Sequence, residues 1–134
     1  MTLRERVLGA WELVSFTTRD TGTGEERHPL GTRPRGLILY TDDGHMSAQL
    51  ADSDMGGYIA YGGRFHVNEA TSNLHHDVTM SMMPELLASP QFRQASVDGD
   101  LLTLSATMTD DAGATTHSAL VWRRGDSAEV FPAS

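Results

Sequence analysis

The sequence predicts an all-β protein: an eight-stranded antiparallel up-and-down barrel with a short N-terminal helical turn. Short β-type runs alternate with turn residues along the chain, which is typical of a sandwich or a barrel. Three connections have hairpin chemistry, at Asp42-Asp43-Gly44, Asp98-Gly99-Asp100 and Asp110-Asp111-Ala112-Gly113. Neighbouring strands are therefore expected to be antiparallel, and closure of the sheet into a barrel removes its exposed edges.

The helical turn is expected at residues 2–8, where Thr2 can act as N-cap and Glu5 can complete a capping box. The strands are predicted at 10–19, 35–41, 45–51, 60–67, 73–82, 91–97, 101–109 and 115–124. A further turn is expected at Asn68-Glu69-Ala70. Two connections are longer: residues 20–34 have the length of a functional loop or lid, and residues 83–90 have room for one helical turn.

The hairpin around residues 41–46 allows two registers. A three-residue turn with Gly44 in the left-handed region places Tyr40 opposite Met46 on one face. A two-residue turn instead groups Tyr40 with His45, Ser47 and Gln49. We favour the three-residue turn.

The composition is that of one folded domain over residues 1–134, with 39% hydrophobic and 21% charged residues. The absence of cysteine excludes disulfides and thiolate catalysis and favours a cytoplasmic location. The absence of lysine excludes Schiff-base chemistry through a side-chain amine. A net charge of −8 argues against nucleic-acid binding, and we expect neither a membrane span nor a signal peptide. The oligomeric state stays open, and a homodimer is compatible with the sequence.

Segments spread over nearly the whole chain match the pattern of a known family. The most specific is Gly36-Leu37-Ile38-Leu39-Tyr40-Thr41-Asp42-Asp43-Gly44-His45-Met46-Ser47. The others are Leu8–Ser15, His28–Gly31, Tyr58–Tyr61, His75-His76, Asp98–Ser105 and Trp122-Arg123. In these segments the chain resembles the small bacterial and fungal lipocalin-like domain proteins.

The resemblance implies an eight-stranded barrel with an internal cavity, and it does not imply a single activity. Related barrels in natural-product pathways act as cofactor-free cyclases or isomerases. The resemblance also implies a closed floor, in which the indole of Trp11 lies across one end and an arginine after Trp122 stacks on it. The segment from Ala51 to Gly57 is shorter and richer in glycine than the family pattern, which predicts a more open mouth.

Histidine is the natural acid or base at neutral pH, and four histidines fall in the middle strands. His75 and His76 are neighbours on one predicted strand, so they must point to opposite faces. The apolar face of that strand is expected to contain Leu74, His76, Val78, Met80 and Met82. His76 is therefore predicted inside the barrel, either as a catalytic residue or as a hydrogen-bonded core histidine.

Three residues are candidates for catalysis: His76 or Tyr61 for proton transfer, and Arg93 for polarising an oxygen of the substrate. Arg93 could equally point outward as a surface charge. The residues predicted to contact a ligand are Tyr40, Met46, Gln49, Tyr58, Val78, Met80 and Gln91. Tyrosine combines an apolar ring with a hydroxyl, and methionine adapts to irregular pockets.

The sequence has no Gly-x-Ser-x-Gly, phosphate-binding or dinucleotide-binding motif, and no His-Glu-x-x-His. We therefore expect no cofactor and no metal, although a haem held by one histidine would leave no sequence pattern. The predicted function is binding of a mainly hydrophobic, polyketide-like molecule and its cofactor-independent cyclisation or isomerisation. A non-catalytic carrier or sensor is the alternative. A purely structural barrel would have a cavity below about 100 Å³, against ~300–1,000 Å³ for ligand sites.

Overall fold

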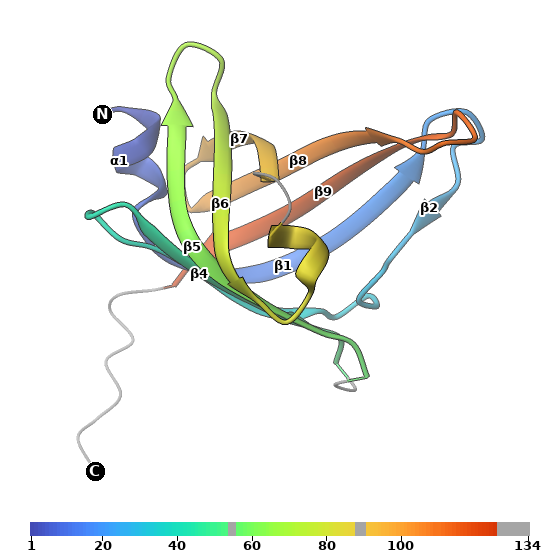
Figure 1. Ribbon diagram of the computed structural model, residues 1–134, viewed down its shortest axis with the longest axis horizontal. Helices are drawn as coiled ribbons and strands as arrows, with labels where there is room; N and C mark the ends of the chain where they lie inside the picture. Colours follow the sequence, from blue (N-terminus) through green and yellow to red (C-terminus); the bar gives the residue numbers. More distant parts are fainter. Residues whose placement is uncertain (54–55, 88–90, 126–134) are drawn as a thin grey trace.

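The computed structural model describes residues 1–53, 56–87 and 91–125 (Figure 1). One short helix, α1 (Leu3–Val7), precedes the strands, and a 3₁₀ turn, η1 (Pro84–Leu87), lies between two of them. The strands are β1 (Gly9–Asp20), β2 (Glu26–Arg27), β3 (Arg35–Tyr40), β4 (His45–Ala51), β5 (Tyr58–Asn68), β6 (Asn73–Ser81), β7 (Gln91–Asp98), β8 (Leu101–Thr109) and β9 (Thr115–Arg124). All eight predicted strands are confirmed, with shifts of one or two residues at their ends.

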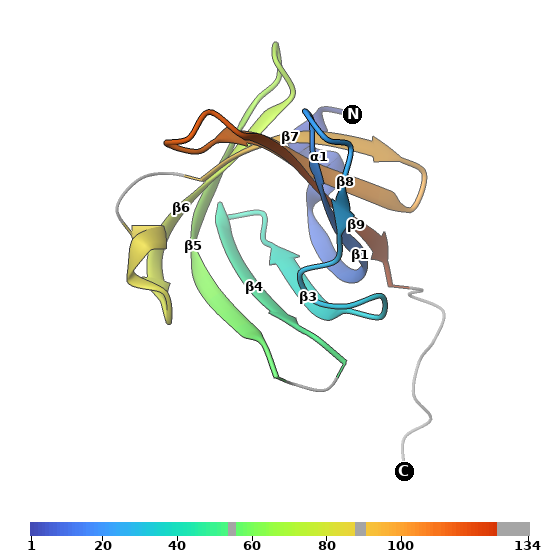
Figure 2. The ribbon, with the colours of Figure 1, turned by 90° about the vertical axis from the view of Figure 1, so that its right-hand side faces the viewer.

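The strands form one antiparallel sheet in the order β2-β1-β3-β4-β5-β6-β7-β8-β9, and pairing of β1 with β9 closes eight of them into a barrel. Figure 2 shows this ring from its open end, with α1 behind it. The small strand β2 was not predicted. It lies inside residues 20–34, which we expected to form a loop or lid, and it pairs with residues 18 and 19 of β1.

The β3–β4 hairpin has the predicted three-residue turn. Tyr40 is opposite Met46, Ile38 is opposite Ala48, and Gly44 has a φ of +90°. All four of these side-chain-bearing residues are buried. Gln49, predicted to contact a ligand, therefore points outward and is exposed, because it alternates with the buried residues Ala48 and Leu50.

A β-bulge in β6 overturns part of the predicted alternation. Gly62 is paired with Met80 and Gly63 with Val78, so Thr79 is an extra residue on β6. The extra residue moves the next side chains to the opposite face. Val78 stays buried, whereas Met80 and Met82 are 74% and 58% exposed, which corrects their placement on the inner face. A Cβ at Gly63 would overlap the carbonyl oxygen of Asp77, so this close approach requires glycine.

One end of the barrel is closed by α1 and by a stacked pair of side chains. Thr2 and Glu5 form the predicted capping box, and the indole Nε1 of Trp11 donates to the carbonyl of Val7 at 2.8 Å. The guanidinium of Arg124 lies 4.1 Å from the centre of the Trp11 ring. It also donates to the carbonyls of Leu8 and Arg6, at 2.8 and 2.6 Å. The floor predicted from the family resemblance is thus present.

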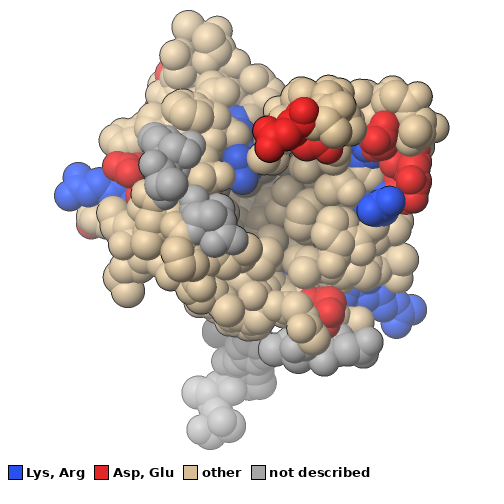
Figure 3. Space-filling view, turned by 45° about the vertical axis from the view of Figure 1, so that its right-hand side comes forward, with Lys and Arg blue, Asp and Glu red and all other residues tan. Residues whose placement is uncertain are grey.

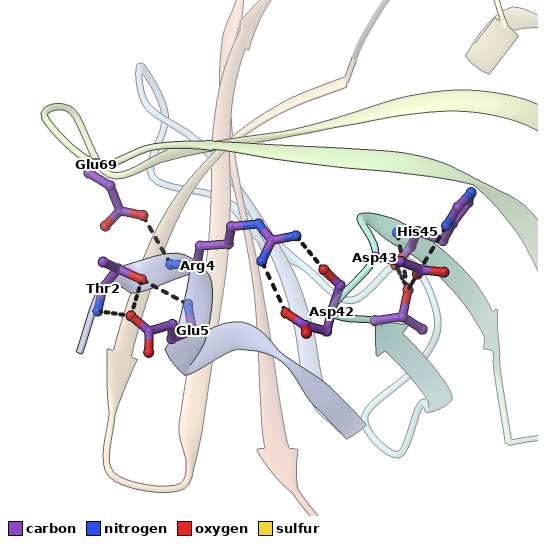
Figure 4. A network of polar contacts seen from close by, with 8 residues as sticks. Thr2, Arg4, Glu5, Asp42, Asp43, His45 and Glu69 are labelled. Atoms are coloured by element: carbon purple, nitrogen blue, oxygen red, sulfur yellow. Dashed lines mark hydrogen bonds and ion pairs between the residues drawn. The ribbon is translucent and has the colours of Figure 1, made fainter.

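A second set of polar contacts ties α1 to the hairpin turns around it (Figure 4). Glu69, in the turn between β5 and β6, accepts hydrogen bonds from the backbone N–H groups of Leu3 and Arg4. Arg4 donates to the carbonyl of Asp42 at 2.8 Å, and its guanidinium lies 5.4 Å from the centre of the Phe65 ring. The helix is therefore held against two connections of the barrel that are far apart in sequence.

We predict that Arg124→Met lowers the free energy of unfolding by about 2–4 kcal/mol, because it removes two charge-assisted hydrogen bonds and the contact with Trp11. Arg123→Met is the matched control, since Arg123 is exposed on the same strand. It should change stability by less than ~0.5 kcal/mol. Urea denaturation of both variants measures the difference. Equal effects of the two substitutions would show that the floor does not stabilise the barrel.

Candidate ligand-binding site

The half of the barrel toward the open end contains a cavity of about 170 Å³. Its lining comes from seven strands and from the residue before η1: Phe16, Leu50, Ile59, Tyr61, His76, Met83, Gln91, Arg93, Leu104, Leu120 and Trp122. The molecule is hollowed on the side that Figure 3 shows, with basic side chains close to the hollow. The volume is close to that of the ~150 Å³ cavity that is known to hold benzene, so a single ring fits.

His76 is the buried polar side chain at the base of this cavity, with 1% of its surface exposed. Its Nε2 lies 2.7 Å from the Oη of Tyr40, and its Nδ1 lies 3.5 Å from the Oη of Tyr61, which is long for a hydrogen bond. Cross-strand pairing explains the arrangement. Tyr61 and His76 both point inward from the neighbouring strands β5 and β6, and Tyr40 reaches His76 from β3.

The three groups are neutral near pH 7. Burial, followed by the nearby charges of Arg93 and His75, lowers the pKa of His76 to about 3. Burial raises the pKa of Tyr40 well above its usual value and raises that of Tyr61. His76 is therefore a weak base, and both of its ring nitrogens face tyrosine hydroxyls.

Hydrogen-bond accounting favours one tautomer of His76. The only partner of the Tyr40 hydroxyl among the described residues is His76 Nε2, so a proton on Nδ1 lets Tyr40 donate to Nε2. The other tautomer would leave the buried hydroxyl hydrogen of Tyr40 without an acceptor, at a cost of about 1–3 kcal/mol. With the proton on Nδ1, the Tyr61 oxygen can accept from His76. The Tyr61 hydroxyl hydrogen is then available to the cavity.

Arg93 lies on the inner face of β7, since it pairs with the buried residue Leu74 on β6. Its Nη1 donates to the carbonyl of Phe92 at 2.8 Å, and its other N–H groups have no carboxylate partner among the described residues. The structure thus resolves the open choice for Arg93 in favour of the inward orientation.

Trp122 has a further buried donor. Its indole Nε1 is the one buried side-chain nitrogen or oxygen in the described part of the chain that has no hydrogen-bond partner. The ring is 1% exposed and lines the cavity. A buried N–H without a partner costs about 1–3 kcal/mol. Nε1 itself has less than 1 Å² of accessible surface, so the ring and not its N–H group faces the cavity.

Four of the predicted site residues meet at the cavity: His76, Tyr61, Arg93 and Gln91. Three others are buried in the barrel without lining the cavity: Tyr40, Met46 and Val78. The remaining three point outward, away from this cavity: Gln49, Tyr58 and Met80. Their contact with a ligand stays a prediction. Tyr58 is 43% exposed because it stands three positions from the inward residue Tyr61, and an odd separation on a strand reverses the face.

The analysis of the sequence missed Trp122 as a cavity residue, along with the apolar lining residues Phe16, Ile59, Leu104 and Leu120. The alternation of β8 and β9 assigns Leu104, Leu120 and Trp122 to one face, so this part of the lining could have been found. Two larger hollows have volumes of about 560 and 820 Å³: the first is lined mainly by β1, β3 and β4, and the second by β4, β5 and β6, with Tyr61 among its residues. His76 lines neither of them.

A closed antiparallel barrel, with one sealed end and a small apolar cavity that contains a few polar groups, defines the class of proteins that bind small molecules inside a β-barrel. The family model described as a lipocalin-like domain matches residues 8–56 and 51–125, and the chain belongs to this family. Among curated proteins, none matches the chain. In the described residues, no helix is long and apolar enough to cross a membrane, and no three His, Asp or Glu residues gather as metal ligands.

We predict that His76 makes stability depend on pH. The pKa of His76 is about 3 in the folded protein and 6.5 for an exposed histidine, so the unfolded chain binds the proton more readily. The free energy of unfolding should therefore fall as the pH falls from 6.5 toward 3, with a slope of up to about 1.4 kcal/mol per pH unit.

Urea denaturation between about pH 5 and 6.5, above the range in which carboxylates titrate, measures this slope. His76→Gln should flatten it, whereas the exposed control His28→Gln should leave it unchanged. Parallel curves for the wild type and His76→Gln would contradict the assignment.

Proposed function

We propose that the barrel binds a small, mainly apolar carbonyl compound and promotes its cofactor-independent isomerisation or cyclisation. The observation that carries the proposal is the pair of hydrogen-bond donors among the residues that line one apolar cavity: the Tyr61 hydroxyl and the Arg93 guanidinium. They come from β5 and β7, strands that the closed sheet holds in fixed relation.

Such donors can stabilise negative charge that develops on a substrate oxygen. Donors that are already oriented in a site with little water need no rearrangement during the reaction, and loss of one typically costs 10²–10³ in kcat. The apolar walls would hold the substrate in a reactive conformation, which contributes through orientation. A polyketide-like substrate would place one ring in the cavity, and the assignment to a natural-product pathway rests on the family resemblance.

In this proposal His76 is a positioning residue, and its effect on the substrate passes through Tyr61. Both ring nitrogens face tyrosine hydroxyls, and protonation is unfavourable because burial holds the pKa of His76 at about 3. Complete transfer of a proton along Tyr40, His76 and Tyr61 would leave a buried phenolate at Tyr40, whose pKa is raised by burial. We therefore assign Tyr61 the role of hydrogen-bond donor to the substrate.

A carrier or sensor is the second candidate, and one observation favours it. The lining residues that the structure describes include no aspartate or glutamate, and both ring nitrogens of His76 are directed to tyrosine hydroxyls, so neither is free to act as a base. A carrier needs only the apolar walls and the donors. A cytoplasmic location and a homodimer stay predictions in either case.

Acetophenone, a single-ring ketone with exchangeable methyl protons, is a suitable probe. We predict that the protein binds it and accelerates its proton exchange in D₂O. Hydrogen bonds to the carbonyl oxygen acidify the methyl group, and deuteroxide that enters from the solvent accepts the methyl proton and leaves deuterium in its place. Tyr61→Phe should lower the exchange rate by about 10²-fold while the Kd changes by less than about 10-fold. NMR integration of the methyl signal measures the exchange.

Tyr58→Phe is the matched control, since it removes the same hydroxyl from the outer face of the same strand. It should leave both binding and exchange unchanged. Binding of acetophenone without accelerated exchange would support the carrier, and equal effects of the two tyrosine variants would contradict the role of Tyr61.

A further inference from the structure

Arg93 has an unusual environment for an arginine. It is half-buried on the inner face of β7, and no aspartate or glutamate is within ion-pair distance of it among the described residues. A charge that is partly removed from water is unfavourable unless an opposite charge compensates it. Its single hydrogen bond goes to the carbonyl of Phe92, a neutral group.

The rest of the chain makes this unpaired cation more notable. The chain has eighteen aspartate and glutamate residues and only ten arginines, so its net charge is −8. Among the acidic residues whose side chains the structure describes, none lines the cavity. The charge of Arg93 also acts on the cavity directly, since it lowers the pKa of His76 and opposes the rise in the pKa of Tyr61. Arg93 therefore places a positive charge at the cavity of an acidic protein.

Another polar group of the cavity lining has the same preference. The favoured tautomer of His76 leaves the Tyr61 hydroxyl hydrogen available to the cavity. A carboxylate accepts hydrogen bonds on two oxygens, and its negative charge would compensate the positive charge of Arg93. A neutral ketone has one acceptor oxygen and leaves Arg93 uncompensated.

From this arrangement we infer that the natural ligand is a small apolar acid, whose carboxylate binds Arg93 while its ring or chain fills the cavity. The inference rests on the proposed function, because it names the chemical class of the molecule that the same site binds. The apolar lining, which includes Phe16, Leu104 and Leu120, would hold the hydrophobic part.

The test compares two probes of nearly equal shape: benzoate, which is anionic, and acetophenone, which is neutral. Titration calorimetry gives both Kd values at low salt. Benzoate should bind about 10- to 100-fold more tightly than acetophenone, the range expected for one or two hydrogen bonds to a charged group. The indole N–H signal of Trp122, one of only two tryptophans, should shift when either probe binds.

Arg93→Gln should abolish the preference for benzoate, because the affinity for benzoate falls by a larger factor than the affinity for acetophenone. Arg93→Lys should restore part of the preference, because it keeps the charge without the planar fork. Arg64→Gln is the matched control: Arg64 is exposed on β5, and its loss changes the net charge by the same amount. This variant should behave as the wild type.

The outcomes separate the two proposals. Equal affinity of the wild type for benzoate and acetophenone would overturn the inference of an acidic ligand and leave the proposed function standing. Failure of both probes to bind would contradict the proposed function itself. Loss of benzoate preference in Arg64→Gln would show that net charge, and not Arg93, attracts the anion. The wild-type comparison is decisive even if a variant does not fold.

Discussion

Pairing of β1 with β9 is the constraint on which the rest of the structure depends. It joins the two ends of the sheet along nearly the full length of both strands, from Trp11 and Arg124 at one end to Asp20 and Thr116 at the other. This pairing turns the sheet into a barrel, so that one face of the sheet becomes the interior and is buried without a second sheet packed against it. The stacking of Arg124 on Trp11 then seals the end at which both strands meet α1.

The interior of the barrel has two parts, a packed core near the sealed end and a cavity toward the open end. Near α1, large side chains such as Trp11, Tyr40, Phe65 and Leu74 are almost fully buried and pack against one another. Toward the open end, the side chains do not fill the barrel and leave a cavity. The polar groups of His76, Tyr61 and Arg93 line this cavity, at its boundary with the packed core. A polar group in this position can be compensated by a ligand as well as by the protein.

The bulge at Thr79 contributes to the same division. It turns Met80 outward, and the inward direction passes to the next position along β6, Ser81, which is opposite Tyr61. The pairing of β6 with β7 is limited to residues 73–76 and 91–94, after which β6 continues without β7. His76 and Gln91 form the last pair, so the polar part of the cavity lies where these two strands separate.

The alternation of apolar residues and the chemistry of the hairpin turns were enough to predict the eight strands, the three-residue turn at Gly44 and the inward direction of His76. These features are local, because both the alternation of side chains along a strand and the turn at a glycine with positive φ are determined by a few neighbouring residues. His76 became a candidate through this alternation and the acid–base chemistry of histidine, and Tyr61 because tyrosine combines an apolar ring with a hydroxyl.

The tertiary structure decided what depends on contacts between distant strands. An extra residue is visible only against a partner strand, so the bulge that exposes Met80 could not be read from alternation. The inward direction of Arg93, the hydrogen bond between Tyr40 and His76 and the missing partner of Trp122 Nε1–H likewise arise from the register of strands far apart in sequence. The residue pattern by itself determined a closed barrel with polar groups inside, and the closure of the sheet decided which of them share one cavity.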